Sequence, residues 1–355
     1  MTTLFDAYRS GRLSLPNRVV MAPMTRVRAA PGGLATPAMA AYYAQRATAG
    51  LIVSEGVQPS LVGQSNPGTP GLHTDEQTAS WRPVTAAVHA NGGRIFAQIM
   101  HGGRVSHPDT TGTDPVGPSA VPGTGRVFTP NGPRPLPVPR ALDTGEVPEH
   151  AASYADAARR AVGAGFDGVE LHGANGYLIS QFLAPNANRR TDRYGGSIAG
   201  RIRFAVEAAA ATAEAVGADR TGIRLSPGAG IWGVEETDVP ELYTALLEEL
   251  ARLGLAYVHL EATTDEEVLL GLRRTWPGTL IVSPGTPGGP KQTGPDDAEH
   301  WLGLGADLIG FGRAYIANPD LVERLRNALP LAPADEASFY EGGDQGYLTY
   351  PAYQY

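Results

Sequence analysis

Cysteine is absent from this chain of 355 residues, and lysine occurs only once, at Lys291. Without cysteine, the protein has no disulfide bond, no thiolate zinc site, no iron–sulfur cluster and no thiol nucleophile. A single lysine leaves little room for Schiff-base chemistry. No window approaches the roughly 18 consecutive uncharged apolar residues of a membrane-spanning helix, so the sequence predicts none.

Positive charge is also scarce. The chain has 28 Lys plus Arg against 36 Asp plus Glu, which gives a formal net charge of −8 at pH 7. Without a stripe of basic residues, this balance argues against nucleic acid as a partner. The first twenty residues carry Asp6, Arg9 and Arg12 and no apolar segment of signal-peptide length, so we expect a cytoplasmic protein.

Glycine and proline are abundant by contrast, with 45 and 30 residues, which indicates many loops and turns between regular elements. Apolar residues make up 42% of the chain, an ordinary share for a protein with a substantial core. The length suits either two ordinary domains or one large α/β barrel.

The apolar residues fall in eight short β-rich runs that alternate with longer amphipathic segments. The expected strands are 19–22, 51–54, 95–99, 168–171, 222–226, 257–261, 280–283 and 307–311. The expected helices are 37–48, 75–90, 149–164, 201–216, 240–253, 266–275, 295–304 and 318–328. Continuous apolar strands, unlike alternating ones, indicate a parallel sheet covered by helices. Eight such units predict an α/β protein, a (β/α)8 TIM barrel forming a single domain over residues 1–355.

One stretch departs from this alternation. Residues 102–147 are rich in Gly and Pro, have no helical periodicity and lie between the third strand and the third helix. The loop after a barrel strand lies at the C-terminal mouth of the barrel, so we expect this excursion to cap the mouth as a lid. His101 and His107, six residues apart near its start, have no third ligand at metal spacing, so we expect no metal site.

Polar residues and glycines, together with Pro23 and Met24, lie within or just after the C-terminal parts of the predicted strands, at the end of a barrel where enzymes of this fold place their chemistry. They are Pro23, Met24, Thr25, Glu55, Gly56, Gln98, His172, Asn175, Tyr177, Arg224, Glu261, Gly285, Gly312 and Arg313. Because all carboxyl ends of the strands meet at one mouth, we expect these side chains to converge on one ligand. Gln98, with both donors and acceptors, suits the edge of a heterocycle.

The last two strand ends suggest a phosphate site. The stretch SPGTPGG from Ser283 onward offers bare backbone N–H groups, and Gly312 with Arg313 adds another N–H and a guanidinium fork. Arg224 lies inside a strand, where an unpaired charge costs several kcal/mol, so we expect an anionic or strongly accepting group beside it. A planar heterocycle with a phosphate tail matches these requirements.

With these features, the sequence resembles the old yellow enzyme family of FMN-dependent ene-reductases. The resemblance rests on LPNRVVMAPMTR, HGANGYLISQFLAPNANRRTDRYGGS, GRAYIANPDLVERL and SFYEGGDQGYLTYP, and it covers essentially the whole chain. It implies non-covalent FMN, with NADPH or NADH as reductant in a ping-pong cycle. The substrates it implies are small α,β-unsaturated carbonyl or nitro compounds whose C=C bond is reduced.

The resemblance also implies a role for each residue at the mouth. Pro23, Met24 and Thr25 contact the flavin, Gly56 and Gln98 meet its pyrimidine side, and Arg224 offsets charge near N1. The phosphate contacts that it implies are Gly285, Gly312 and Arg313, and His172 lies against both flavin and substrate. His172 and Asn175 hold the substrate carbonyl oxygen while Tyr177 donates a proton, and their spacing of three predicts neighbouring positions on one helical turn.

Three further positions are expected at the substrate: Asn66, Met100 and Tyr340. The first two are aromatic in several relatives of the family that the chain resembles, so we expect a wider or differently shaped pocket here. Tyr340 is expected to supply an aromatic wall.

Each residue also has a structural explanation when it is taken singly. His172 and Asn175 could be a satisfied polar pair, Tyr177 a core residue, and Arg224 a partner of Glu261 or Glu55 in a buried salt bridge. Two alternative functions therefore stay open: a flavin-independent lyase or hydrolase on the same barrel, and a non-catalytic flavin-binding protein.

Overall fold

The computed structural model describes residues 2–285 and 292–354. Lys291 and most of the SPGTPGG stretch, from residue 286 onward, lie outside the described residues. The predicted strand and helix pattern can be compared with the structure everywhere else.

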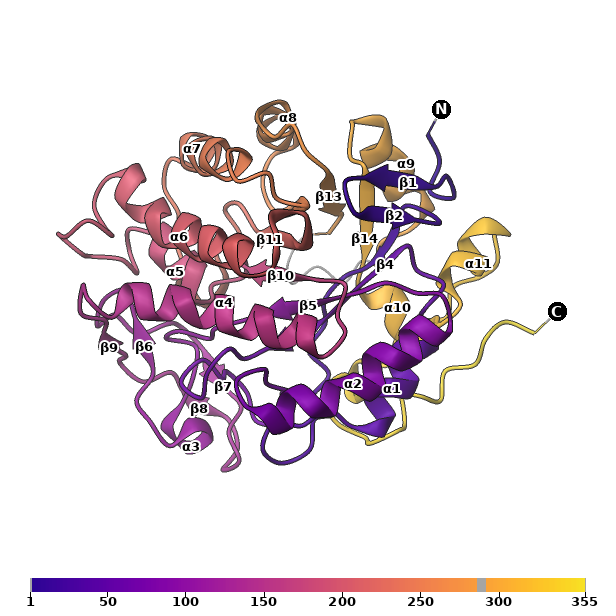
Figure 1. The fold of residues 1–355 in the computed structure, drawn as a ribbon, viewed down its shortest axis with the longest axis horizontal. Coiled ribbons are helices and arrows are strands. Elements are labelled where there is room, and N and C mark those ends of the chain that lie inside the picture. The colour runs from indigo at the N-terminus through magenta and orange to yellow at the C-terminus, as the bar shows by residue number, and fades with distance from the viewer. Residues whose placement is uncertain (1, 286–291, 355) are drawn as a thin grey trace.

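Eight parallel strands close into a barrel in the order β10-β11-β12-β13-β14-β3-β4-β5. The strands are β3 (Val19–Met21), β4 (Leu51–Val57), β5 (Ile95–Ile99), β10 (Gly168–His172), β11 (Thr221–Leu225), β12 (Tyr257–Glu261), β13 (Leu280–Ser283) and β14 (Leu308–Phe311). Helices surround this barrel (Figure 1). The structure therefore confirms the predicted (β/α)8 TIM barrel.

The helices begin and end close to the predicted positions. Those that follow the barrel strands are α1 (Pro37–Ala44), α2 (Asp75–Ala90), α4 (Val147–Gly163), α6 (Ile198–Val216), α7 (Val239–Ala251), α8 (Glu266–Thr275) and α9 (Pro295–Gly303). The short α5 (Leu178–Leu183) precedes α6. Capping explains several N-termini: Thr74 and Gln77 form a reciprocal capping box at the start of α2.

The helix predicted over 318–328 is divided in the structure. The chain forms α10 (Arg313–Ala317) and then α11 (Leu321–Arg326). Pro319 disfavours a helical conformation at the preceding Asn318. The Asn318 backbone N–H and side chain both donate to the carbonyl of Ala314, at 3.1 and 2.8 Å, and so cap the end of α10.

Strand β4 is longer than predicted. Glu55 and Gly56, expected in the loop after the strand, lie inside it, and the pairing register between β4 and β5 shifts between Val53 and Gly56. Such a shift marks a bulge, which redirects side chains near the end of a strand. Glu55 is consequently buried beside Tyr43, whose hydroxyl accepts a hydrogen bond from the Glu55 backbone N–H at 2.9 Å.

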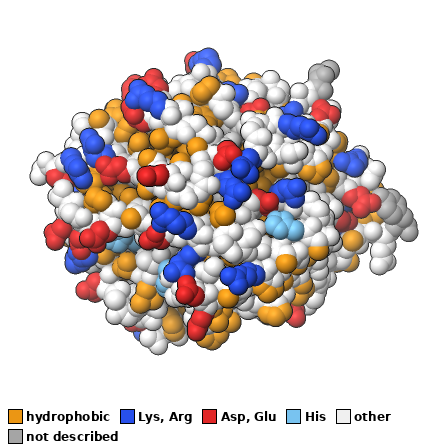
Figure 2. All heavy atoms as spheres, viewed as in Figure 1, with side chains coloured by type: hydrophobic (Ala, Val, Ile, Leu, Met, Phe, Trp, Pro, Cys, Tyr) orange, Lys and Arg blue, Asp and Glu red, His pale blue; other side chains and the backbone are white. Residues whose placement is uncertain are grey.

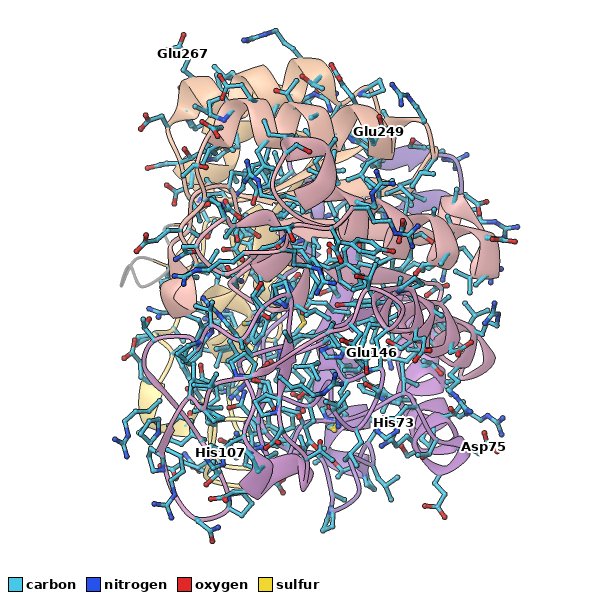
Figure 3. The ribbon with its side chains drawn as sticks, turned by 90° about the vertical axis from the view of Figure 1, so that its left-hand side faces the viewer. His73, Asp75, His107, Glu146, Glu249 and Glu267 are labelled. Atoms are coloured by element: carbon cyan, nitrogen blue, oxygen red, sulfur yellow. The ribbon has the colours of Figure 1, made fainter. Side chains whose placement is uncertain are left out.

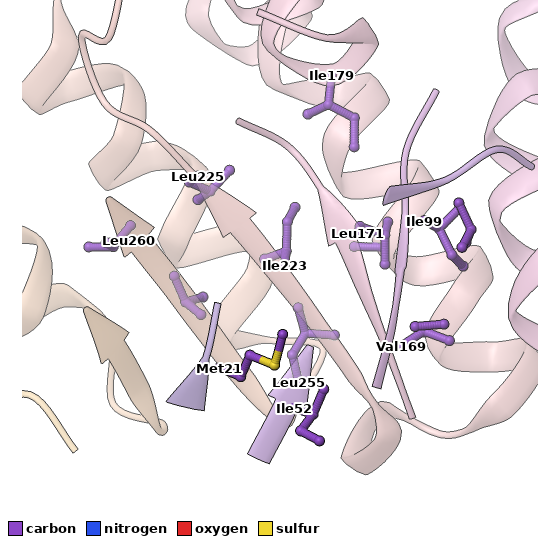
Figure 4. Packing of buried hydrophobic residues seen from close by; sticks show 14 of the residues in the cluster. Met21, Ile52, Ile99, Val169, Leu171, Ile179, Ile223, Leu225, Leu255 and Leu260 are labelled. Atoms are coloured by element: carbon purple, nitrogen blue, oxygen red, sulfur yellow. The ribbon is translucent and has the colours of Figure 1, made fainter. Parts of the chain in front are cut away.

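Two apolar clusters hold the barrel together. The larger lies between the strands and the helices and includes Met21, Leu171, Ile223 and Leu225 (Figure 4). The smaller joins inward-facing residues of the barrel to a hairpin that the sequence did not predict, formed by β1 (Tyr8–Ser10) and β2 (Leu13–Leu15). Leu13 and Leu15 of this hairpin pack against Val20, Leu51, Val53, Phe96, Tyr257, Ile281 and Leu308.

The excursion over 102–147 has little regular structure: α3 (Pro108–Thr111) and the short strands β6 (Val116–Gly117), β7 (Arg126–Val127), β8 (Arg134–Pro135) and β9 (Arg140–Ala141). Its apolar residues Val105, Val127 and Leu136 pack against Tyr177 and Trp232. The excursion therefore caps the side of the mouth where Tyr177 lies, as predicted.

Several hydrogen bonds hold the excursion in place, among them those of Arg104 and Arg140. The Arg104 guanidinium donates to the carbonyls of Trp232 and Gly233, at 3.3 and 3.0 Å, in the loop after β11. Arg140 binds both oxygens of Glu146, at 2.7 and 3.0 Å, just before α4.

Figure 3 shows His107, at the start of α3, at the opposite end of the molecule from Glu267 of α8.

Acidic and basic side chains are interspersed on the face shown in Figure 2, and neither sign forms a large patch there. Among the described residues, no helix combines the length and apolar character needed to cross a membrane. Within residues 2–285 and 292–354 there is also no group of three His, Asp or Glu side chains placed to hold a metal ion.

Candidate active site at the barrel mouth

His172 and Tyr177 come together at the mouth. His172 is the last residue of β10 and is 4% exposed, whereas Tyr177 is half-buried and directly precedes α5. Their ring centroids are 5.1 Å apart. The end of β10 and the start of α5 thus place an imidazole and a phenol on the same side of the mouth.

The loop between them is not the helical turn that the spacing predicted. Asn175 has a left-handed backbone, with φ of 57°, and Gly176 follows with φ of 77°. Gly176 must lack a side chain, because a Cβ there would lie 2.5 Å from the carbonyl oxygen of Ile231. Asn tolerates the left-handed region better than most residues, and the Asn175 backbone N–H donates to Ser226 Oγ at 2.8 Å.

His172 is a neutral imidazole with a defined tautomer. Its Nδ1 accepts a hydrogen bond from the backbone N–H of Ala174 at 3.3 Å, so the ring proton is on Nε2. Burial lowers the pKa of His172 well below its ordinary value, and the neighbouring Arg224 and His259 lower it further. The ring can therefore donate one hydrogen bond from Nε2 at neutral pH.

Tyr177 keeps its proton over the physiological pH range. Burial raises its pKa to about 12, the nearby Tyr340 hydroxyl adds to this, and interactions with the side chains of Trp232 and Ser65 partly oppose it. Trp232 is contributed by the loop after β11 and Ser65 by the segment after β4. Tyr340 comes from the C-terminal segment and is 55% exposed.

Arg224 lies inside β11, with His172 of β10 and His259 of β12 as its register partners. It forms a buried ion pair with Oε1 of Glu261. The sequence had left Glu261 and Glu55 as the two possible salt-bridge partners of Arg224. The same oxygen accepts a hydrogen bond from Asn175 Nδ2 at 2.9 Å. Arg224 Nε and Asn175 Oδ1 are buried and have no hydrogen-bond partner among the described residues.

The barrel interior contains a buried network of polar side chains that the sequence analysis did not predict. Gln98 Nε2 donates to Glu170 Oε1 at 2.8 Å, His259 Nδ1 lies 2.9 Å from Glu170 Oε2, and His259 Nε2 lies 2.8 Å from Ser283 Oγ. Burial would raise the pKa of Glu170, but His259, Arg224 and Gln98 together lower it. The strands are therefore not continuously apolar, as the sequence pattern suggested, but carry a polar layer inside the barrel.

The sequence held a signal for this network. Glu170 and His259 are single polar residues in the middle of apolar strands, in VEL and VHL, at positions that face the barrel interior. Because a carboxylate only accepts, the Glu170 contact directs the Gln98 amide nitrogen inward. The Gln98 oxygen and its second N–H then remain for a ligand.

The segment after β3 carries Pro23, Met24 and Thr25, all half-buried. The next residue, Arg26, is buried and donates to the carbonyls of Phe339 and Gly346 at 2.9 and 2.8 Å. Arg26 thereby ties this segment to the C-terminal stretch that carries Tyr340. The sequence showed Arg26 in MAPMTR but gave no indication that it binds a segment more than three hundred residues away.

Gly56 and Met100 pack together at the ends of β4 and β5. A Cβ on Gly56 would lie 2.9 Å from Sδ of the buried Met100, so a larger residue at position 56 would force the methionine side chain to shift. Asn66 is half-buried, and its Nδ2 lies 3.4 Å from Oγ of Ser65. The Ser65 side chain in turn interacts with the Tyr177 hydroxyl. Asn66 thus lies near the proton-bearing phenol, whereas Met100 lies beneath the backbone of β4.

The three predicted phosphate contacts follow the neighbouring strands β13 and β14. Gly285 is exposed, with φ of 149° and open space where a Cβ would be. Gly312 directly precedes α10, and Arg313 is its first residue. Arg313 Nη1 lies 3.5 Å from Glu336 Oε1, and its guanidinium stands over the Phe339 ring at 5.9 Å.

The comparisons with known proteins decide the family. Residues 3–332 match the model of the NADH:flavin oxidoreductase / NADH oxidase family. The chain belongs to the old yellow enzyme family.

Its relatives match over nearly their whole length. The chain is 40% identical to a chanoclavine-I aldehyde reductase of Penicillium roqueforti, covering 99% of this chain and 96% of that protein. It is 39% identical to 12-oxophytodienoate reductase 7 of Oryza sativa subsp. japonica, covering 98% and 94%. The solved structure of morphinone reductase in complex with tetrahydroNAD has a TM-score of 0.94 and 42% identity, covering 100% of this chain and 98% of that one.

As an old yellow enzyme family member, this protein is an FMN-dependent NAD(P)H oxidoreductase. The residues at the mouth fit such a cofactor. Arg224 Nε is a buried N–H without a partner among the described residues, and Gln98 bonds Glu170 through only one of its amide hydrogens. A flavin ring, which presents both carbonyl oxygens and ring nitrogens at its edge, can satisfy these groups.

Proposed function

We propose that this enzyme reduces the C=C bond of α,β-unsaturated carbonyl or nitro compounds in a ping-pong cycle with NAD(P)H. The observation that carries this proposal is the pairing of a neutral His172, protonated on Nε2, with a protonated Tyr177 at the same mouth. Such a pair supplies a hydrogen-bond donor for a carbonyl oxygen and a separate source of a proton. Residues 1–355 act in this proposal as a single FMN-binding barrel domain.

When bound, reduced FMN supplies the hydride that adds to the β-carbon of the substrate. Negative charge then builds on the substrate's carbonyl oxygen. His172 Nε2–H and an Asn175 amide N–H donate to this oxygen and stabilise the charge. Each donor of this kind contributes about 3–4 kcal/mol to lowering a barrier, because it is preorganised where the charge develops.

Tyr177 supplies the proton that the α-carbon needs. A general acid must hold its proton until the carbanion forms, and a pKa of about 12 keeps the phenol protonated at neutral pH. The excursion residues Val105, Val127 and Leu136 pack against Tyr177 and shield the phenol from bulk water.

The remaining mouth residues hold the cofactor in this proposal. Thr25 and Gln98 would bond the heteroatoms of the ring, and Arg224 would offset negative charge on it. The backbone of the β3 and β4 ends lies against the ring, at Pro23, Met24 and Gly56. The phosphate is held by Gly285, Gly312 and Arg313, and His172 contacts the ring as well as the substrate.

The substrate side of the site is bounded by Asn66, Met100 and Tyr340 in this proposal. The two curated relatives are named for the reduction of an aldehyde and of an oxo compound. These names support carbonyl substrates, and we propose cyclic enones, maleimides and nitroalkenes. A cytoplasmic location and a monomeric or homodimeric state stay predictions.

The test uses the purified holoenzyme without oxygen. NADPH or NADH should bleach the flavin absorbance, and 2-cyclohexenone added afterwards should restore it. Failure of the nicotinamides to bleach the flavin would favour the alternative of a non-catalytic flavin-binding protein. Bleaching without reoxidation by any enone or nitroalkene would refute the proposed substrate class. Family membership already argues against the flavin-independent lyase or hydrolase.

A further inference from the structure

Glu261 connects two of the proposed functional residues. It ends β12 and is 6% exposed. One of its oxygens, Oε1, pairs with Arg224 Nη2 and also accepts from Asn175 Nδ2 at 2.9 Å. Glu261 is not itself proposed to contact the substrate or the flavin. It touches Asn175, a proposed substrate donor, and Arg224, a proposed flavin contact.

The first consequence concerns the amide of Asn175. An ionised carboxylate only accepts hydrogen bonds, so Asn175 must turn its NH₂ toward Glu261 and its Oδ1 away. That Oδ1 is buried and has no partner among the described residues. The backbone is fixed as well, because the left-handed Asn175 donates its N–H to Ser226 Oγ. One hydrogen of the NH₂ is held by Glu261, and the second remains available to a substrate oxygen.

The second consequence concerns charge. Arg224 is a buried cation next to Glu261 and within electrostatic reach of Glu170. Its histidine neighbours add little positive charge, because burial lowers the pKa of both His172 and His259. Glu261 therefore offsets much of the positive charge of Arg224. A cation beside a flavin favours the reduced, electron-rich form, and a nearby carboxylate opposes this.

We propose that Glu261 is a positioning residue that fixes the amide orientation of Asn175 and tempers the charge of Arg224. The proposal rests on the proposed function, which places Asn175 at the substrate and Arg224 at the flavin. In this arrangement Glu261 keeps the reduced cofactor a strong hydride donor. It also presents the Asn175 amide as a donor and prevents it from offering its oxygen.

The decisive variant is Glu261→Gln, which keeps the size of the side chain and removes its charge. With the charge of Arg224 no longer offset, the equilibrium of the holoenzyme with a reference dye should move toward reduced FMN by about tenfold, equivalent to about 30 mV for a two-electron couple. The affinity for 4-hydroxybenzaldehyde, a phenolate mimic of the enolate, should fall severalfold because the Asn175 amide can now rotate.

Glu267→Gln is the matched control. Glu267 allows the same chemical change on the outer helix α8, where its side chain is exposed at the surface (Figure 3). The flavin midpoint potential and the phenol affinity of the Glu267→Gln enzyme should equal those of the unmodified enzyme. If Glu261→Gln also leaves both quantities unchanged, the proposal is wrong, and the proposed function stands as long as NADPH still bleaches the flavin and an enone restores it.

Two further variants cover the case in which Glu261→Gln does not fold or does not retain FMN. Glu261→Asp keeps the charge but shortens the side chain, so the potential should stay near the original value while phenol affinity falls. An unchanged phenol affinity in this variant would contradict the positioning role. In an Asn175→Ala background, Glu261→Asp should no longer affect phenol affinity, because a residue that acts through Asn175 has no effect without it.

Discussion

The rings of His172 and Tyr177 lie with their centroids 5.1 Å apart and their planes inclined by 59°, across a loop of only four residues. The left-handed backbone at Asn175 and Gly176 brings the start of α5 back toward the end of β10. In this geometry an imidazole N–H and a phenol O–H can reach two different atoms of one bound molecule.

Replacing Tyr177 with Phe should remove the proton donor and keep the ring. We expect the oxidative half-reaction with 2-cyclohexenone to slow by about 10²–10⁴-fold, the usual contribution of a positioned general acid. The reduction of the flavin by NADPH should change little, since it needs no proton from Tyr177. Rapid-mixing absorbance measurements of each half-reaction check this, and an equal loss in both would contradict the assigned role.

The pH dependence of the unmodified enzyme follows from the same residue. The pKa of Tyr177 is raised to about 12, so its proton is bound throughout the range in which the protein is handled. The rate of enone reduction should therefore show no loss from Tyr177 ionisation between about pH 7 and pH 10, where an ordinary tyrosine begins to titrate. A decline in that half-reaction with a midpoint near pH 10, absent from Tyr177→Phe, would show that the phenol has an ordinary pKa.

Replacing His172 with Ala should remove one donor to the substrate oxygen. We expect a loss of about 3–4 kcal/mol of transition-state stabilisation in enone reduction and a weaker affinity for 4-hydroxybenzaldehyde. Spectral titration of the flavin measures the affinity. Unchanged binding of the phenol would remove His172 from the oxygen site.

The protonation of His172 links the site to stability. Its pKa is lowered in the folded protein, so the unfolded chain binds more protons than the native state below the ordinary histidine pKa. Its stabilising contribution is therefore present above about pH 6.5 and is lost as the pH falls toward the lowered value. Urea unfolding at pH 7.5 and pH 5.5 should show a smaller loss of stability in His172→Ala than in the unmodified enzyme.

The barrel itself was readable from the sequence because eight short runs rich in apolar residues alternate with longer amphipathic segments. The eight predicted strands lie within a few residues of the observed ones, and β4 differs most, since its bulge carries Glu55 and Gly56 inside the sheet. The hairpin of β1 and β2 escaped prediction because three-residue strands have no resolvable periodicity. Its place at the barrel depends on tertiary packing of Leu13 and Leu15.

The site was readable as a set of residues but not as a geometry. A spacing of three between His172 and Asn175 resembles a helical turn, and only the two positive φ values show otherwise. Likewise, the bond from Asn175 to Glu261 joins residues 86 positions apart, and no local pattern indicates it. Glu170 and His259 stood out as isolated polar residues, but their partnership depends on the barrel register.

The predicted phosphate contact can be tested at Arg313. Replacing it with Ala should weaken FMN binding by about 10- to 150-fold, the value of one charge-assisted hydrogen bond of roughly 1.5–3 kcal/mol. Arg252→Ala is a suitable control, because Arg252 directly follows α7, is exposed and pairs with Glu249. Fluorescence titration of the apoprotein with FMN measures both. Equal affinities in the two variants would exclude Arg313 as a phosphate contact.

The buried network around Glu170 should be important for folding. Replacing Glu170 with Leu leaves the Gln98 amide and the His259 ring without their shared acceptor inside the barrel. We expect a loss of about 3–5 kcal/mol in the free energy of unfolding, because removing one partner leaves the others buried and unpaired. Glu170→Gln keeps the shape and one acceptor, and should cost less than Glu170→Leu. Urea unfolding of both variants, each saturated with FMN, distinguishes the two. Equal stability of Glu170→Leu and the unmodified enzyme would show that the network is not needed for the barrel and serves only to orient Gln98 toward the cofactor.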